Sequence, residues 1–403
     1  MPQPFWRRPI YILICASAVI MVAVGIRQSF GLFLKPISLD LGWGFGIFAS
    51  AIAVQNLMIG IGAPFIGAIA DRWGQVRVMA LSGACYAVGL YFISQSTTQG
   101  GMMLSAGFLT GLGLAGVGLP LMLAVVGQAA PEEKRSLWLG IVTAGGTAGQ
   151  MVVVPLSQGF IDQFGWYATI LILSAAAAMI VPLVLSMASA KSAAPTKPDR
   201  QSLSQALAEA ARHRGYILLV TGFFVCGLHV QFIATHLPNY LSDSGLGAGL
   251  AATAIAVIGL FNMIGTYTAG YLGGKLRKNY LLSAIYFARS IVILVFFQLP
   301  ISEASVMIFD AAIGLLWLST VPLTGGIVAG VFGTRYMATL YGIVFLSHQL
   351  GSFTGVWLGA VIRDATGSYD IFWWVTVVFG LLAALIHWPI DVRPVARLAE
   401  ENG

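Results

Sequence analysis

Two basic side chains lie deep inside apolar stretches of the sequence. Arg27 stands within the apolar run 10–35, and His229 stands within the run 216–241. An ionisable side chain inside a membrane is costly and usually faces a cavity or a partner. A guanidinium group also presents a fork of N–H donors that matches a carboxylate. The pair therefore favours a binding site for a small organic anion. The alternative is structural, with Arg27 donating to backbone carbonyls and His229 a satisfied core histidine.

Neutral polar side chains in other apolar runs extend this candidate site. Thr143, Thr147 and Gln150 are spaced four and three residues apart, so they share one face of a helix. Asn262 and His348 stand near the middle of two further runs. We expect Gln150, His348 and Asn262 to contact the substrate. The alternative role is hydrogen bonding between helices, a common use of polar groups in membrane spans.

The residue patterns of enzymes are missing from the sequence. It shows no activated nucleophile, no metal cluster and no nucleotide-binding loop. The three cysteines, Cys15, Cys85 and Cys226, are widely spaced within apolar runs, which favours neither disulfides nor a metal site. We therefore expect no enzymatic activity, no cofactor and no metal ion.

The composition indicates which elements position these residues. The 403 residues are 58% hydrophobic and only 9% charged, whereas a soluble domain carries roughly 25% charged residues. A helix needs about 20 apolar residues to cross a bilayer. Twelve such spans are predicted, near 10–35, 46–69, 78–96, 102–127, 137–159, 166–188, 216–241, 249–273, 280–299, 304–331, 338–361 and 369–390.

The basic residues predict the orientation of these spans. Of the 21 Lys and Arg residues, 17 fall in segments on one side of the predicted spans, and only Lys35 and Arg363 fall on the other. Basic loops stay in the cytoplasm, so we expect both termini there, in a bacterial inner membrane. The net charge of +6 is therefore a topology signal, and a nucleic-acid partner is not expected.

The two halves of the chain repeat each other. An offset of 202 residues superposes Pro120-Leu121 on Pro322-Leu323 and Gly140-Ile141-Val142 on Gly342-Ile343-Val344. The same offset superposes Arg27 on His229. Six spans per repeat return the chain to the same side, so the repeats are parallel. The predicted organisation is a six-helix bundle at 1–188, a cytoplasmic linker at 189–214, a second bundle at 215–392 and a cytoplasmic tail at 393–403.

One loop carries a resemblance to a known family. Residues 67–77 read GAIADRWGQVR, which resembles the signature loop of the major facilitator superfamily. The resemblance implies an all-α fold of twelve transmembrane helices in two parallel six-helix repeats. It also implies that the first, fourth, seventh and tenth helices line a central cavity. The signature residues Gly67, Asp71, Arg72 and Gly74 are then gating residues, and Asp71 pairs across the interface between the halves.

A second resemblance narrows the family. The run Ser29–Ile37 is similar to the monocarboxylate-porter branch and its bacterial relatives. That branch carries an Asp and an Arg four residues apart on the eighth helix. This sequence has Asn262 and Thr266 at those positions, so the substrate-binding Arg of the animal carriers is missing.

Two ionisable residues remain outside the candidate site. Arg289, in the ninth span, either extends its stem towards the cytoplasm or reaches Asp310. Asp310 is the one acid inside a span away from the end loops. The cavity-facing helices offer no central Asp or Glu, which argues against an acid-based proton relay and against organic cations as substrates.

Together these features predict a monomeric secondary transporter of small organic anions, in particular monocarboxylates, that works by alternating access. His229 is the candidate for proton coupling, because a bound carboxylate offsets the charge of Arg27 and favours a second positive charge. The expected partners are the organic anion, the lipid bilayer and protons. An exporter of amphipathic drugs or metabolites is the first alternative, and a solute sensor that transports nothing is the second.

Overall fold

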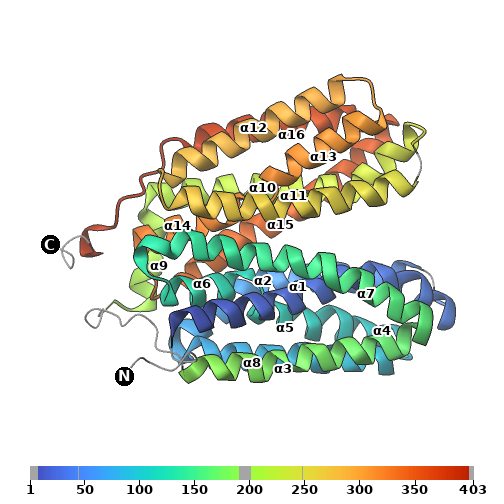
Figure 1. Cartoon of the computed structure of the whole chain (residues 1–403), viewed down its shortest axis with the longest axis horizontal. Helices are drawn as coiled ribbons and strands as arrows, with labels where there is room; N and C mark the ends of the chain where they lie inside the picture. The colour runs from blue at the N-terminus through green and yellow to red at the C-terminus, as the bar shows by residue number, and fades with distance from the viewer. Residues whose placement is uncertain (1–7, 44, 190–200, 247, 399–403) are drawn as a thin grey trace. The chain divides into compact units, whose positions relative to one another are not determined.

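The computed structural model describes residues 8–43, 45–189, 201–246 and 248–398, and helices are the regular elements of these residues (Figure 1). The first three are α1 (Pro9–Asp40), α2 (Phe45–Trp73) and α3 (Gln75–Gln95). Proline at the first turn of α1 suits a helix start, because its missing N–H has no helical partner there. Gly74 separates α2 from α3 with φ of 97°, a conformation that favours glycine.

The predicted fourth span is a helix in pieces. It comprises α4 (Gln99–Met102), the π-helix η2 (Met103–Leu109), α5 (Thr110–Val117) and α6 (Leu119–Ala129). The break between α5 and α6 falls at Gly118, directly before the start of α6, where Pro120 cannot donate a backbone hydrogen bond. The sequence predicted one continuous span, 102–127.

The predicted tenth span is broken at a related place. It consists of α13 (Glu303–Leu316) and α14 (Thr320–Phe332), which are separated by residues 317–319. Pro322, the counterpart of Pro120, follows this break near the start of α14. Both repeats therefore carry an interruption just before the repeated Pro-Leu pair.

The fifth and sixth predicted spans are joined. The helix α7 (Arg135–Ala178) runs through both, with Gly165 in a non-helical conformation at φ of 77°. It is followed by α8 (Ile180–Ser186), and the short 3-10 turns η3 (Glu132–Lys134) and η4 (Met187–Ser189) flank the pair. The predicted gap at 160–165 is therefore a kink at one glycine.

The remaining helices belong to the second half of the sequence. They are α9 (Leu203–Arg212), α10 (Arg214–Asp243), α11 (Ala248–Gly273), α12 (Lys278–Gln298), α15 (Met337–Thr366) and α16 (Asp370–His387). The predicted linker 189–214 contains α9, and its residues 190–200 lie outside the described residues. Residues 399–403 of the predicted tail also lie outside them.

The chain forms two compact units. Unit 1 comprises Met1–Glu132, Gly145–Arg200 and Arg335–Gly342, and unit 2 comprises Glu133–Ala144, Gln201–Thr334 and Ile343–Gly403. In unit 1, α2 and α3 pack against α5. A Cβ atom at Gly113 of α5 would lie 2.6 Å from the backbone nitrogen of Tyr86 in α3. Small residues permit this close packing where the surrounding lipid is as apolar as the side chains.

Unit 2 has an aromatic core. In this unit α12 packs along α16, and α11 packs along α13. Trp373 of α16 is fully buried, and its ring centroid lies 5.0 Å from that of Phe232 in α10 and 5.9 Å from that of Phe296 in α12. These ring contacts pack α10, α12 and α16 against one another.

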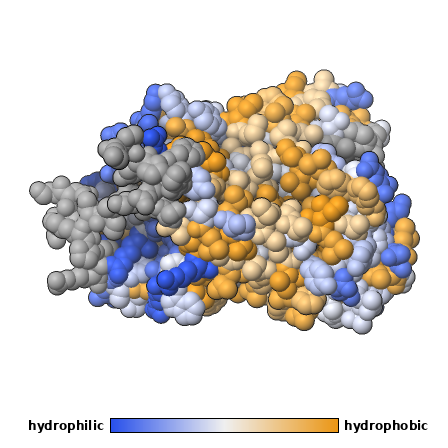
Figure 2. All heavy atoms as spheres, turned by 60° about the horizontal axis from the view of Figure 1, so that its bottom comes forward, coloured by the Kyte–Doolittle hydropathy of each residue, from blue (hydrophilic) through white to orange (hydrophobic). Residues whose placement is uncertain are grey.

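The outer surface is apolar. Ten stretches of the described residues are long and apolar enough to cross a membrane. One of them, Glu132–Ser186, has 55 residues, which suffices for the two crossings predicted there. The ten do not include α15, whose middle carries Ser347, His348 and Gln349. Figure 2 shows one face, where hydrophobic residues cover the middle and hydrophilic residues gather towards both ends.

Candidate functional site

Arg27 of α1 lies beside a polar residue of α2. Its Nη2 donates a hydrogen bond of 2.6 Å to Oδ1 of Asn56. The side chain of Arg27 is half-buried, and within the described residues no carboxylate forms an ion pair with it. Because a guanidinium has five N–H donors, most of its donors are not used by Asn56. The structure thus leaves a cation inside unit 1 whose charge is not neutralised by an acid.

The helix that carries Gln150 packs directly on α1. A Cβ atom at Gly25 of α1 would lie 2.7 Å from the carbonyl oxygen of Gly149 in α7. A Cβ atom at Gly149 would lie 2.0 Å from the carbonyl oxygen of Met21. These two glycines bring the backbones together and place Gln150 next to the contact. Its amide is half-buried, so two of the predicted site residues, Arg27 and Gln150, lie on packed helices of unit 1.

His229 lies in the interior of unit 2. Its Nε2 is 2.8 Å from the carbonyl oxygen of Thr376 in α16. A carbonyl oxygen accepts, so Nε2 carries the hydrogen in this arrangement. Its Nδ1 is buried and has no partner among the described residues. The side chain faces the packing between α10 and α16, close to Gly380.

The other two predicted residues of unit 2 have local partners. His348 stacks on Phe345, with ring centroids 5.6 Å apart and planes within 4°, and its Nδ1 lies 3.2 Å from Oε1 of Gln349. Asn262 of α11 accepts a 3.0 Å hydrogen bond from the backbone N–H of Leu318. This N–H stands in the break between α13 and α14, so Asn262 compensates for a missing helical bond.

Arg289 binds the backbone carbonyl oxygens on the α13 side of the same break. It is 1% exposed, and its Nε donates to the carbonyl oxygen of Leu316 at 3.1 Å. Its Nη2 donates to the carbonyl oxygens of Leu316 and Trp317. These carbonyls end α13, where a cation also interacts favourably with the helix dipole. Arg289 therefore neither extends towards the helix end nor pairs with Asp310.

A polar cluster surrounds Arg289. Two of its members, Cys226 and Thr320, were not predicted from the sequence as site residues. Nη1 of Arg289 lies 3.6 Å from Sγ of Cys226, and that sulfur lies 3.2 Å from Oγ1 of Thr320. The sequence offered one signal for this cluster. Cys226 stands three residues before His229, and therefore on the same side of α10.

The signature residue Asp71 contacts the second half of the sequence. Its Oδ2 accepts hydrogen bonds from the backbone N–H of Thr339 at 2.9 Å and from Oγ1 of Thr339 at 2.6 Å. One turn earlier, a Cβ atom at Gly67 would lie 2.6 Å from the carbonyl oxygen of Ala338. Gly67 and Asp71 thus form one contact between the end of α2 and the start of α15. These two hydrogen bonds link Asp71 to a threonine of the second half of the sequence.

A related contact joins α7 to α11 in unit 2. A Cβ atom at Gly140 would lie 2.7 Å from the carbonyl oxygen of Thr266 and 3.0 Å from the Cα atom of Gly270. Its counterpart by the offset, Gly342, would place a Cβ atom 2.9 Å from the carbonyl oxygen of Ala63 in α2. The two repeated Gly-Ile-Val segments thus lie at helix contacts, the first where α7 packs on α11 and the second where α15 packs on α2.

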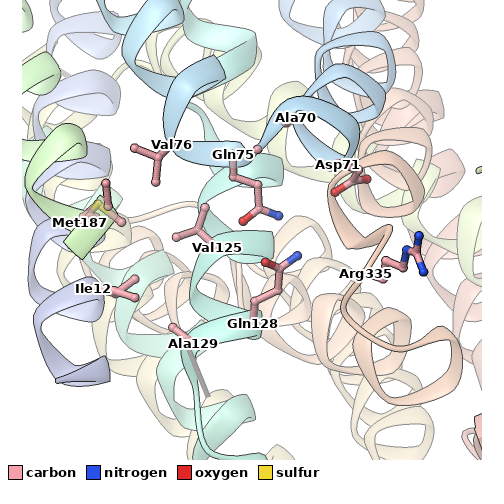
Figure 3. A pocket seen from close by; sticks show the side chains of 12 residues that line it. Ile12, Ala70, Asp71, Gln75, Val76, Val125, Gln128, Ala129, Met187 and Arg335 are labelled. Carbon is pink, nitrogen blue, oxygen red and sulfur yellow. The ribbon is translucent and has the colours of Figure 1, made fainter. Parts of the chain in front are cut away.

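A pocket opens beside Asp71. It has a volume of about 280 Å³ and is lined by residues of α1, α2, α3, α6 and η4 together with Arg335. Figure 3 shows the amides of Gln75 and Gln128 facing the pocket, with Asp71 and Arg335 to one side. The lining is polar around Asp71 and apolar around Ile12 and Met187.

Comparisons with known proteins identify the family of the chain. A family model described as Major Facilitator Superfamily matches residues 13–356, and the chain belongs to that superfamily. YcxA of Bacillus subtilis, described as an uncharacterized MFS-type transporter, is 25% identical over 379 residues, 90% of each chain. Monocarboxylate transporter 11 of Mus musculus is 25% identical over 388 residues, which cover 92% of this chain and 85% of that protein.

Solved structures share the fold. The fucose:proton symporter FucP of E. coli matches with a TM-score of 0.73 at 16% identity, over 94% of this chain and 97% of that one. The proton:xylose symporter XylE matches with a TM-score of 0.76 at 13% identity, over 97% and 98%. The predicted all-α membrane fold and its superfamily are therefore confirmed. The chain is a multi-pass secondary transporter and is not an enzyme.

Proposed function

We propose that this transporter carries small organic anions, in particular monocarboxylates, by alternating access. The observation that supports this substrate class is the state of Arg27. It is a half-buried guanidinium inside a membrane helix, bonded to the neutral Asn56 rather than to an acid. A carboxylate of the substrate would supply the missing negative charge, and the remaining N–H donors would bind it in a fork.

Gln150 and the similar proteins add support. Gln150 lies where α7 packs on α1 and offers an amide donor for the same anion. The relatives include proteins described as monocarboxylate transporters. Asn262 occupies a position where the monocarboxylate-porter branch has an acid, and here it binds the backbone of Leu318. In this proposal Arg27 of unit 1 supplies the cation for the substrate.

The test is transport by the purified protein in proteoliposomes. Uptake of labelled carboxylates of increasing size is measured with and without a pH gradient, beside efflux of an amphipathic cationic dye. We expect carboxylates to enter and to accumulate when the outside is more acidic. If the protein moves the dye but no carboxylate, it is an exporter of amphipathic compounds and the proposal is wrong. Binding of a carboxylate without movement would identify a sensor.

We also propose that the contact between Asp71 and Thr339 is a gating contact. Asp71→Ala removes an ionised acceptor from two hydrogen bonds, and each such bond contributes about 1.5–3 kcal/mol. A change of 1.4 kcal/mol is tenfold in an equilibrium constant. We therefore expect the open population of this contact to rise at least about tenfold. The reporter is Ala338→Cys, because Ala338 is fully buried in the contact and reacts with a thiol reagent only when it opens.

Thr339→Val is the matched control for this contact. It removes the hydroxyl but keeps the backbone N–H, so its alkylation rate should lie between those of the parent and Asp71→Ala. Arg77→Ala removes an exposed cation at the start of α3 and should leave the rate near that of the parent. An unchanged rate in Asp71→Ala would refute the gating role.

A further inference from the structure

Asp310 is a carboxyl group buried without a partner. It lies on α13, its side chain is 0% exposed, and neither Oδ1 nor Oδ2 has a hydrogen-bond partner among the described residues. Native proteins rarely leave a buried polar group unpaired, and each such group needs an explanation. Inside a membrane span, an ionisable residue of this kind is a candidate for function.

The surroundings of Asp310 are apolar. Phe309, Val306 and Ile313 of the same helix belong to the buried core of unit 2. The ring of Phe309 stacks on that of Phe296 in α12, with centroids 3.9 Å apart. Within the described residues, no side chain of this core forms a hydrogen bond with the carboxyl group.

The titratable groups of the neighbouring helices are occupied or distant. On α11, which packs along α13, residues 248–266 include no titratable side chain. On α12 the cation is Arg289, whose guanidinium binds the carbonyl oxygen of Leu316. Leu316 is six residues beyond Asp310, or about 9 Å along the helix at 1.5 Å per residue. The others are Tyr267 and Tyr271 on α11, Lys278, Tyr280 and Tyr286 on α12, Arg214, Tyr216, Cys226, His229, His236, Tyr240 and Asp243 on α10, and Asp370 and His387 on α16.

The three histidines among these groups bind elsewhere. His229 binds the carbonyl oxygen of Thr376, His236 lies 3.0 Å from that of Val356, and His387 lies 2.7 Å from that of Ala383. None of these bonds involves α13. Among the described residues, no hydrogen bond or ion pair holds the carboxyl group of Asp310 as an anion in this conformation.

Burial without a counter-charge decides the protonation state of Asp310. An unpaired ion in a protein interior costs several kcal/mol even after the protein relaxes. A neutral carboxylic acid avoids this charge penalty and leaves only polar groups unpaired. Burial in this conformation therefore favours the protonated acid over the carboxylate.

We propose that Asp310 is the group that binds and releases the coupling proton of this transporter. Release converts the acid to the carboxylate and passes the proton to water, so it requires a conformation in which water or a cation reaches Asp310. The helix α13 ends at Leu316, before the break at 317–319. This interruption lets α13 move separately from α14, which ties exposure of Asp310 to a conformational change.

Asp310 fits this role better than His229. The Nε2 hydrogen of His229 is already donated to Thr376, and a second proton would create a positive charge near that of Arg289. Protonation of Asp310 removes a charge, whereas protonation of His229 adds one. The inference rests on the proposed proton-coupled anion transport.

Asp310→Asn tests the proposal, because it imitates the protonated acid permanently. In proteoliposomes we expect exchange of labelled carboxylate across the membrane to continue at a rate within about threefold of the parent. Accumulation driven by a pH gradient should be lost. Glu303→Gln is the matched control, since it neutralises an exposed acid in the first turn of the same helix and should accumulate normally. Asp310→Glu should restore accumulation in part.

Accumulation by Asp310→Asn equal to that of the parent would overturn the proposal. The proposal would also be overturned if His229→Gln lost this accumulation while Asp310→Asn kept it. The infrared C=O band of a protonated carboxylic acid gives a second measurement, which does not depend on the substrate. We expect this band in the parent at neutral pH and not in Asp310→Asn. If the parent moves no carboxylate, the proposed function fails. The infrared band still decides whether Asp310 holds a proton. An identical band in the parent and in Asp310→Asn refutes the assignment of the proton to Asp310.

Discussion

Arg27→Lys is expected to lose roughly ten- to a hundredfold of the affinity for carboxylates, although it keeps the positive charge. The guanidinium binds Asn56 with one nitrogen and has further donors in a planar fork. A lysine has a compact charge and cannot reproduce that geometry. The loss of one hydrogen bond to a charged group costs about 1.5–3 kcal/mol, which gives the expected change in affinity.

The measurement is the concentration dependence of carboxylate uptake in protein reconstituted at equal density. Arg27→Ala should bind the anion more weakly still, because the charge is lost as well. Lys35→Ala is the matched control, as it removes an exposed cation from the same helix and should transport normally. Full carboxylate transport by a correctly inserted Arg27→Ala protein would contradict the anion site and favour the exporter.

Arg289→Met is expected to lower the stability of the protein by about 2–6 kcal/mol. The substitution leaves the carbonyl oxygens of Leu316 and Trp317 without their donor. A buried polar group that loses its partner costs about 1–3 kcal/mol, and two groups are affected. Thermal unfolding of the purified protein in detergent should show a clear decrease in melting temperature. Arg289→Lys keeps a donor and a charge, so it should recover part of the loss.

Arg277→Met is the control for Arg289, because Arg277 is an exposed cation directly before the same helix. It should unfold at the temperature of the parent. An Arg289→Met protein that unfolds like the parent would show that the bonds to α13 are not structural. Lost transport at unchanged stability would assign Arg289 to the transport mechanism.

The sequence predicted the helices well because their main determinant is the apolar run. It predicted less well where one residue changes the backbone. Gly165 turns two expected spans into one kinked helix, and Gly118 divides the fourth span. Hydropathy does not detect such breaks. The repeated prolines, Pro120 and Pro322, were the available signals, since neither can donate a helical hydrogen bond.

The candidate site was predictable in its residue types but not in its partners. Arg27 and His229 were found as ionisable residues at equivalent positions of the two halves. Their partners differ, because Arg27 donates to the side chain of Asn56 and His229 to the backbone of Thr376. A backbone carbonyl exists at every residue, so the sequence does not show which one is available. For the same reason the role of Arg289 at the end of α13 could not be read from its neighbours in the chain.

Counterflow of a labelled carboxylate tests the central claim most directly. Proteoliposomes are loaded with an unlabelled monocarboxylate of a strong acid and placed in a trace of the labelled anion. A carrier of this anion predicts a transient accumulation of label inside, which the parent and Lys35→Ala should show and Arg27→Ala should not. The absence of label accumulation in the parent for every monocarboxylate tested, in vesicles where it moves another solute, would contradict the account.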